Sequence, residues 1–186
     1  VLNGKVNAEV AKFVSSHDCA VQKLPGKEIL RCQKLEQEPD LGFVGSISEV
    51  KTAPITQALN DGLMPIISST ASDNNDQCYN INADTVAAEV AIALGARRLV
   101  YLSDVPGLLR NPDDPSSLLS SLPVNQVDSL KNEGVIAKGM LPKVNSAVQA
   151  LNSGVNRVHF IDGRLPHSIL LEIFTDEGIG TEIVHA

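Results

Sequence analysis

The sequence predicts an α/β protein with a mostly parallel sheet. Apolar, strand-like runs such as residues 97–102 (RRLVYL) alternate with runs whose apolar residues recur at helical spacing, which is typical of βα units. Glycines stand where three of the helical runs end, at Gly62, Gly95 and Gly154. The 186 residues, of which 43% are hydrophobic, suffice for one sizeable domain or two small lobes with a buried core.

The first half of the chain predicts short elements of both kinds. Val6, Val10 and Phe13 recur at helical spacing, so we expect a helix over residues 2–16. The elements expected after it are strands at 20–24 and 28–35 with a Pro-Gly turn between them, a strand at 42–50, a helix at 52–62, a buried strand at 63–69 and a polar turn at 70–77.

The second half has a more regular rhythm of strands and helices. The expected elements are a helix at 83–94, a buried strand at 97–102, a sharp loop at 103–109, helices at 124–133 and 139–154, a strand at 155–161, a helix at 166–174 and a final strand at 180–184. This order favours a sheet whose parallel strands are joined by helices.

Composition excludes several classes of protein. A net charge of −7 and 3% aromatic residues disfavour nucleic-acid binding, which needs a basic face and stacking side chains. No apolar run approaches the roughly twenty residues of a membrane span. The three cysteines are widely spaced and form no CxxC pair, so we expect reduced thiols in a cytoplasmic protein.

Three short polar side chains precede the helix expected from residue 83. Asn82 is placed to cap that helix, and Asp84 in its first turn complements the helix dipole. Asn80 ends the preceding strand-like segment, where capping does not require it. An amide at the carboxyl end of a strand can donate to a ligand carboxylate. On these residues alone, capping and ligand binding both stay open.

Residues 103–109 (SDVPGLL) follow a buried strand. They predict either a tight turn with Pro106 and Gly107 at its centre, set up by Asp104, or a loop that brings backbone close to a nucleotide. Both interpretations stay open.

Residues 138–145 (KGMLPKVN) open the helix expected from residue 139. Gly139 and Pro142 near its start leave backbone N–H groups free for an anion. Lys143 in the first turn opposes the helix dipole, which indicates a negative group nearby. A solvated surface lysine is the alternative.

Common catalytic and metal-binding motifs are missing from the sequence. It contains no GxxxxGK[ST], no GxGxxG after a strand, no HExxH and no GxSxG. His159 and His167 have no Cys or His at ligand spacing, so we predict no protein metal ligands.

Six segments, in order and spacing, match a known family. They are residues 4–10 (GKVNAEV), 40–50 (DLGFVGSISEV), 79–96 (YNINADTVAAEVAIALGA), 102–109 (LSDVPGLL), 138–145 (KGMLPKVN) and 160–181 (FIDGRLPHSILLEIFTDEGIGT). With them the chain resembles the N-acetylglutamate kinases of the amino acid kinase family. The resemblance implies a three-layer αβα sandwich that transfers the γ-phosphoryl group of ATP to the side-chain carboxylate of N-acetyl-L-glutamate in arginine biosynthesis. It also implies Mg²⁺, held mainly by the ATP phosphates.

The resemblance also implies roles for individual residues. Asn80 would hold acetylglutamate, Asp84 would position the catalytic lysines, and Lys143 would stabilise the charge of the transferring phosphoryl group. The nucleotide site would be lined by Asp104, Val105, Pro106, Gly107, Leu108, Leu109, Val135, Ile136 and Ala137.

The chain departs from the family pattern at its start. It opens with Val1 in a helix, whereas the family begins with a lysine-bearing strand and glycine-rich loops. We therefore expect the N-terminal portion to be missing, with residues 1–95 the remainder of the acyl-substrate lobe and 96–186 the nucleotide lobe. This chain alone is expected to be inactive, and the full-length protein to be a dimer or hexamer.

The C-terminal segment resembles the arginine-inhibited branch of the family. By that match, His159, Glu172 and Gly178 would contribute to an arginine effector site. The alternative is a satisfied strand histidine and a solvated helix glutamate. Two functional alternatives also stay open: a nucleotide- or arginine-binding regulatory module without catalysis, and another amino acid kinase whose acceptor is carbamate, aspartate or a nucleotide.

Overall fold

The computed structural model describes residues 1–137 and 139–185 of the chain. The chain separates into two compact units, with the boundary between Ala93 and Leu94. Each unit combines strands and helices, and most strand pairs are parallel. The α/β prediction with a mostly parallel sheet is therefore confirmed. No helix within the described residues is both long and apolar enough to cross a membrane.

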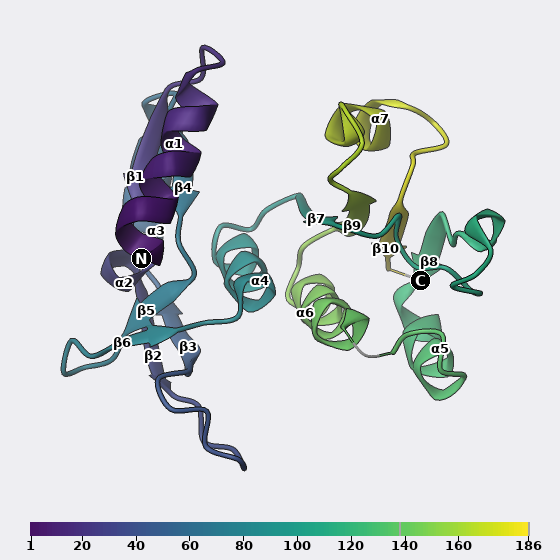
Figure 1. Cartoon of the computed structure of the whole chain (residues 1–186), viewed down its shortest axis with the longest axis horizontal. Helices are drawn as coiled ribbons and strands as arrows, with labels where there is room; N and C mark the ends of the chain where they lie inside the picture. Colours follow the sequence, from purple (N-terminus) through teal and green to yellow (C-terminus); the bar gives the residue numbers. More distant parts are fainter. Residues whose placement is uncertain (138, 186) are drawn as a thin grey trace. The chain divides into compact units, whose positions relative to one another are not determined.

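Unit 1 contains two sheets among its described residues. Its elements are η1 (Leu2–Val6), α1 (Asn7–Ser15), β1 (Val21–Leu24), α2 (Gly26–Ile29), β2 (Leu30–Lys34), β3 (Gly45–Val50), α3 (Thr52–Asn60), β4 (Met64–Ile67), β5 (Thr70–Ser72), β6 (Cys78–Asn80) and α4 (Ala83–Ala93). The first sheet is the parallel pair β1–β4, against which α1 and α3 both pack (Figure 1). The second has the strand order β3-β2-β5-β6, and α4 contacts β3.

Unit 2 is built on one four-stranded sheet among its described residues, in the order β7-β9-β10-β8. Its elements are β7 (Arg98–Ser103), η2 (Pro115–Ser117), β8 (Ser121–Pro123), η3 (Val124–Gln126), α5 (Val127–Asn132), α6 (Met140–Asn152), β9 (Arg157–Asp162), α7 (Ser168–Phe174) and β10 (Thr181–Val184). β7–β9 and β10–β8 are parallel, whereas β9–β10 is antiparallel. Figure 1 shows α7 on one side of this sheet and α6 on the other.

β9 forms the centre of the unit 2 core. Every residue of β9 after Arg157 is buried, because α6 and α7 both pack against the strand. Val158, Phe160 and Ile161, in the strand expected at 155–161, are completely buried. His159 and Asp162 are buried with them and therefore need polar partners inside the protein.

The predicted Pro-Gly turn after residue 24 is instead a helical turn, α2. The N–H groups of Gly26 and Lys27 at its start donate to the hydroxyls of Ser68 and Thr70, at 2.9 and 3.1 Å. Both hydroxyls donate in turn to Oδ1 of Asn3, each at 2.6 Å. This contact between distant segments satisfies the helix start, and a local sequence pattern cannot reveal it.

The prediction of a polar turn over residues 70–77 is wrong at its start. Thr70–Ser72 form the buried strand β5, which pairs with β6. The turn is shorter because Oδ1 of Asp73 accepts from the N–H groups of Asn75 and Gln77, at 2.8 and 2.9 Å.

The buried strand expected at 63–69 is also less buried than predicted. β4 pairs only with β1 among the described strands, and Met64 is 46% exposed. The strand β8 is too short for its sequence to have predicted it.

Gly26→Ala tests the contact of α2 with the segment 68–70. A Cβ at Gly26 would meet the carbonyl oxygens of Ser68 and Thr70, which are backbone atoms and cannot easily move away. We expect the free energy of unfolding to fall by about 2–3 kcal/mol, measured by urea denaturation. Gly4→Ala is the control, because a Cβ there meets nothing within 4 Å. Equal stability of the two variants would contradict the assigned contact.

Candidate functional site

The carboxyl ends of β7 and β9 lie side by side in unit 2. These parallel strands pair in register from Arg98 with Arg157 to Ser103 with Asp162. The segments that follow them therefore start at the same sheet edge, where α/β proteins bind ligands. The N–H of Gly163 donates to the carbonyl oxygen of Ser103 at 2.9 Å and joins the two segments.

A cavity of about 690 Å³ opens at this edge, a volume within the usual range for small-molecule sites. Its lining is mostly apolar and consists of residues 104–109, Pro112, Gly134, Val135, Ala137, Met140 and Arg164. It thus includes eight of the nine residues that sequence analysis assigned to a nucleotide site. The ninth, Ile136, is not part of the lining, because its side chain is 1% exposed and lies in the core.

Ser103 and Thr181 hold the loop that forms one wall of this cavity. The Ser103 hydroxyl donates to the carbonyl oxygen of Val105 at 3.0 Å and accepts from its N–H at 3.2 Å. Oγ1 of Thr181 accepts from the N–H of Leu108 at 2.8 Å. Gly107 has a φ of 147°, and a Cβ there would lie 2.6 Å from the same oxygen, so the position requires glycine. The prediction that Asp104 sets up this turn is wrong, since no hydrogen bond to its carboxylate occurs within the described residues.

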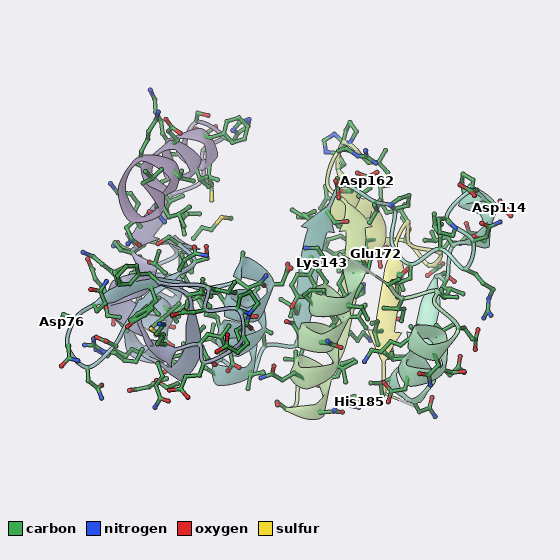
Figure 2. The ribbon with its side chains drawn as sticks, turned by 60° about the horizontal axis from the view of Figure 1, so that its bottom comes forward. Asp76, Asp114, Lys143, Asp162, Glu172 and His185 are labelled. Carbon is green, nitrogen blue, oxygen red and sulfur yellow. The ribbon has the colours of Figure 1, made fainter. Side chains whose placement is uncertain are left out.

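Lys143 lies in the first turn of α6, as predicted (Figure 2), and its ammonium lies over the ring of Tyr101 on β7. Its Nζ is 5.9 Å from the ring centroid of Tyr101, whose ring stacks on Phe160 with centroids 5.2 Å apart. Lys143 is not among the lining residues of the cavity. Lys138, the first residue of the motif at 138–145, lies outside the described residues.

Asn80 and Asp84 belong to unit 1. Asn80 is exposed at the end of β6, and its N–H donates to the carbonyl oxygen of Phe43 at 2.9 Å. Asn82 caps α4 through Oδ1, which accepts from the N–H groups of Asp84 and Thr85 at 2.9 and 3.1 Å. The capping prediction is therefore confirmed. Asp84 is half-buried in the first turn of α4, and the catalytic and binding roles of Asn80 and Asp84 stay predictions.

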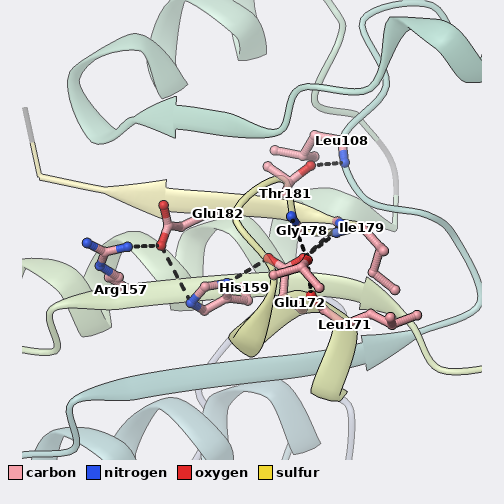
Figure 3. A network of polar contacts seen from close by, with 11 residues as sticks. Leu108, Arg157, His159, Leu171, Glu172, Gly178, Ile179, Thr181 and Glu182 are labelled. Atoms are coloured by element: carbon pink, nitrogen blue, oxygen red, sulfur yellow. Dashed lines mark hydrogen bonds and ion pairs between the residues drawn. The ribbon is translucent and has the colours of Figure 1, made fainter. Parts of the chain in front are cut away.

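A second, polar pocket of about 320 Å³ in unit 2 brings together the three residues predicted for an effector site. Nδ1 of His159 on β9 lies 2.8 Å from Oε1 of Glu172 on α7 (Figure 3). Oε2 of Glu172 accepts from the N–H groups of Ile179 and Gly180 at 2.8 and 2.9 Å. Gly178 passes so close that a Cβ there would lie 2.8 Å from the same oxygen. The alternative of a solvated helix glutamate is therefore wrong, because Glu172 is buried.

Glu172 is a buried carboxylate stabilised in its charged form. Burial raises its pKa, but hydrogen bonds from His159 and from the N–H groups of Ile179 and Gly180 outweigh burial, so the pKa lies below the usual 4.5. An ionised carboxylate can only accept hydrogen bonds. Nδ1 of His159 therefore carries a proton and donates a hydrogen bond to Glu172. Nε2 of His159 is buried without a hydrogen-bond partner in the described part of the chain and lies 3.7 Å from Oε1 of Glu182. In neutral His159, Nε2 and the Glu182 carboxylate together offer acceptors to an N–H donor.

Sequence reasoning missed Asp162 and Arg164, which it used only as part of a matching segment. Arg164 lines the large cavity, and Asp162 holds it through a salt bridge of 2.7 Å. The available signal was an aspartate at the end of a predicted strand, two residues before an arginine. Arg98, Arg157 and Glu182, which line the polar pocket, were also missed. Among the described residues, no three His, Cys, Asp or Glu side chains are grouped to hold a metal ion.

Known proteins resemble this chain in sequence and in fold. The model of the amino acid kinase family matches residues 2–162. An acetylglutamate kinase from Syntrophomonas wolfei is 44% identical over 187 residues, and the match covers 100% of this chain but only 65% of that relative. One from Archaeoglobus fulgidus is 45% identical over 195 residues, covering 98% of this chain and 67% of the relative. The structure of N-acetylglutamate synthase from Neisseria gonorrhoeae complexed with coenzyme A and L-arginine has a TM-score of 0.79 at 30% identity, over 89% of this chain and 38% of that one.

Glu172→Gln tests the buried carboxylate of the polar pocket. Because the folded-state pKa lies below the usual value, the charge of Glu172 stabilises the fold above about pH 4.5. That contribution falls as pH drops below 4.5. We expect the variant to lose about 2 kcal/mol of unfolding free energy at pH 7, and to depend less on pH below 4.5 than the wild type. Urea denaturation at pH 3–7 measures both effects.

Glu177→Gln is the control for this variant, since Glu177 lines the same pocket but is exposed. Losses of equal size in the two variants at pH 7 would contradict the stabilising role of the Glu172 carboxylate.

Proposed function

The chain belongs to the amino acid kinase family, and we propose that it is part of an N-acetyl-L-glutamate kinase of arginine biosynthesis. In the proposed reaction, a side-chain carboxylate oxygen of acetylglutamate attacks the γ-phosphorus of ATP. The bond from that phosphorus to the ADP oxygen breaks, giving an acyl phosphate and ADP. The chain spans 65% of the length of the Syntrophomonas relative, so this activity is proposed for the complete gene product and not for these 186 residues alone.

The large cavity of unit 2 carries the nucleotide part of the proposal. It lies at the carboxyl ends of two parallel strands, where nucleotides bind in α/β proteins, and its volume suits a nucleoside. The residues that resemblance had assigned to ATP line it from two separate segments, at 104–109 and at 135 and 137. Two segments that are separate in sequence, both assigned to ATP by resemblance, line one cavity. This supports ATP as the phosphoryl donor.

Asn80, Asp84 and Lys143 are the proposed catalytic and substrate-binding groups. The amide of Asn80 would donate to a carboxylate of acetylglutamate, since it is exposed and not needed for capping. Lys143 would stabilise the charge on the oxygens of the transferring phosphoryl group, and Asp84 would orient the catalytic lysines. Phosphoryl transfer depends mainly on such positioning and positive charge. Mg²⁺ would bridge the ATP phosphates and supply further neutralisation.

L-Arginine is the proposed effector of the polar pocket. The N-acetylglutamate synthase structure contains arginine, and its match covers 89% of this chain. The pocket offers acceptors on the buried His159 and on the half-buried Glu182, which suit the N–H groups of a guanidinium. We also propose that the complete protein is a cytoplasmic homo-oligomer, a dimer or a ring of dimers.

Calorimetry with MgADP tests the nucleotide site in this chain. We expect saturable binding by the wild type and weaker binding by Lys143→Ala, because the ammonium would lie near the phosphates. In the complete protein, Lys143→Ala should lower kcat about 100-fold or more with acetylglutamate. Lys131→Ala is the control, since the Lys131 ammonium pairs with Asp128 at 3.2 Å.

Three results would overturn parts of the proposal. A complete protein that binds nucleotide but phosphorylates carbamate or aspartate in place of acetylglutamate would be another amino acid kinase. Ligand binding without any turnover would indicate a regulatory module. An unchanged kcat in Lys143→Ala would remove the assigned role of that lysine.

A further inference from the structure

Arg164 is fixed at the edge of the large cavity by a buried carboxylate. Nε of Arg164 donates to Oδ1 of Asp162 at 2.9 Å, and Nη2 donates to Oδ2 at 2.7 Å, so the pair is bidentate. The backbone N–H of Arg164 also donates to Oδ1, at 2.9 Å. Asp162 is 6% exposed and ends the buried strand β9 (Figure 2). Two hydrogen bonds therefore hold the guanidinium in one orientation, and the third holds the backbone of Arg164 against the same carboxylate.

This ion pair persists over the whole range of ordinary pH. The hydrogen bonds from the Arg164 side chain and backbone lower the pKa of Asp162 to about 2. The turn that carries the pair is tied to the base of the cavity loop through Gly163 and Ser103. The guanidinium is thus joined to the cavity wall by hydrogen bonds, although the Arg164 side chain is 65% exposed.

The guanidinium still offers its flat face and its outer edge. Asp162 occupies Nε and one side of Nη2, and Nη1 makes no hydrogen bond within residues 1–137 and 139–185. Its positive charge is already balanced by Asp162, which makes it a weaker partner for a phosphate than a free arginine. A planar guanidinium of this kind stacks on aromatic rings.

The rest of the cavity suits an aromatic ring more than a phosphate. The described lining around Arg164 is mainly apolar, with Leu108, Val135 and Met140 among its members. Asp104, the other charged residue of this lining, is a carboxylate that repels phosphate and accepts from an exocyclic amine or a ribose hydroxyl.

From this geometry we infer that Arg164 is a binding residue for the nucleoside part of the nucleotide, against which the base stacks, while Asp162 is its positioning residue. This inference rests on the proposed function for the presence of a nucleotide. It assigns to Arg164 a contact with the base and not with the phosphates.

Titration calorimetry with adenosine, AMP and ADP tests the inference. We expect Arg164→Ala to weaken binding of all three ligands by a similar factor, about fivefold. Arg164→Lys should weaken them almost as much, because it keeps the charge beside Asp162 but lacks the plane. This second variant retains a cation for the buried carboxylate, so it also guards against unfolding of the alanine variant. Arg110→Ala is the control, since Arg110 is exposed, pairs with Glu133 at 3.8 Å and is not part of the lining.

The outcomes separate this inference from the proposed function. A loss that grows from adenosine to ADP would place Arg164 on the phosphates and overturn the inference. Wild-type affinity in both Arg164 variants would overturn it as well, while the nucleotide site itself would stand. If the wild type binds none of the three ligands, the cavity is not a nucleotide site, and both the inference and the nucleotide part of the proposed function fall.

Discussion

The burial of β9 between α6 and α7 is the constraint on which unit 2 depends. A strand covered on both faces must give each side chain a partner inside the protein. Its apolar residues fill the core, and Phe160 stacks on Tyr101 beneath Lys143. Its two buried polar residues, His159 and Asp162, each require a charged or hydrogen-bonding partner. Each candidate site of unit 2 contains one of these two residues or its partner.

The two sites differ in physical character because the partners of β9 differ. Asp162 takes an exposed arginine from the next turn, which leaves a flat cation at the rim of a mostly apolar cavity. His159 takes Glu172 from a neighbouring helix, and the second oxygen of Glu172 draws in the backbone at residues 179 and 180. The first arrangement suits an aromatic group, and the second suits a ligand that brings N–H donors. One strand thus links a cavity proposed for a nucleotide to a pocket proposed for an effector.

Element type followed from local pattern wherever an element was long and regularly spaced. The helices at 83–93 and 140–152 and the strands at 98–103 and 157–162 lie where their apolar spacing predicted them. Capping by Asn82 was also predictable, because it involves only the next three residues. The helical turn α2 was not, since its N–H groups are satisfied by hydroxyls more than forty residues away. The loop at 104–109 lines the large cavity, and its support could not be predicted, because Thr181 holds it from a strand far along the chain.

The sequence by itself determined the class of fold, the family and the segments that meet at the large cavity. The fold class, the family and these segments follow from short-range spacing and from motifs, which can be recognised without knowing the distant contacts. Only the tertiary structure decided that Ile136 belongs to the core while its neighbours line the cavity, that Glu172 is a buried anion, and that Arg164 is fixed by Asp162. Burial and side-chain direction arise from the packing of elements that are remote in sequence. A local sequence pattern therefore cannot distinguish an arginine, aspartate or glutamate on the surface from one in a binding site.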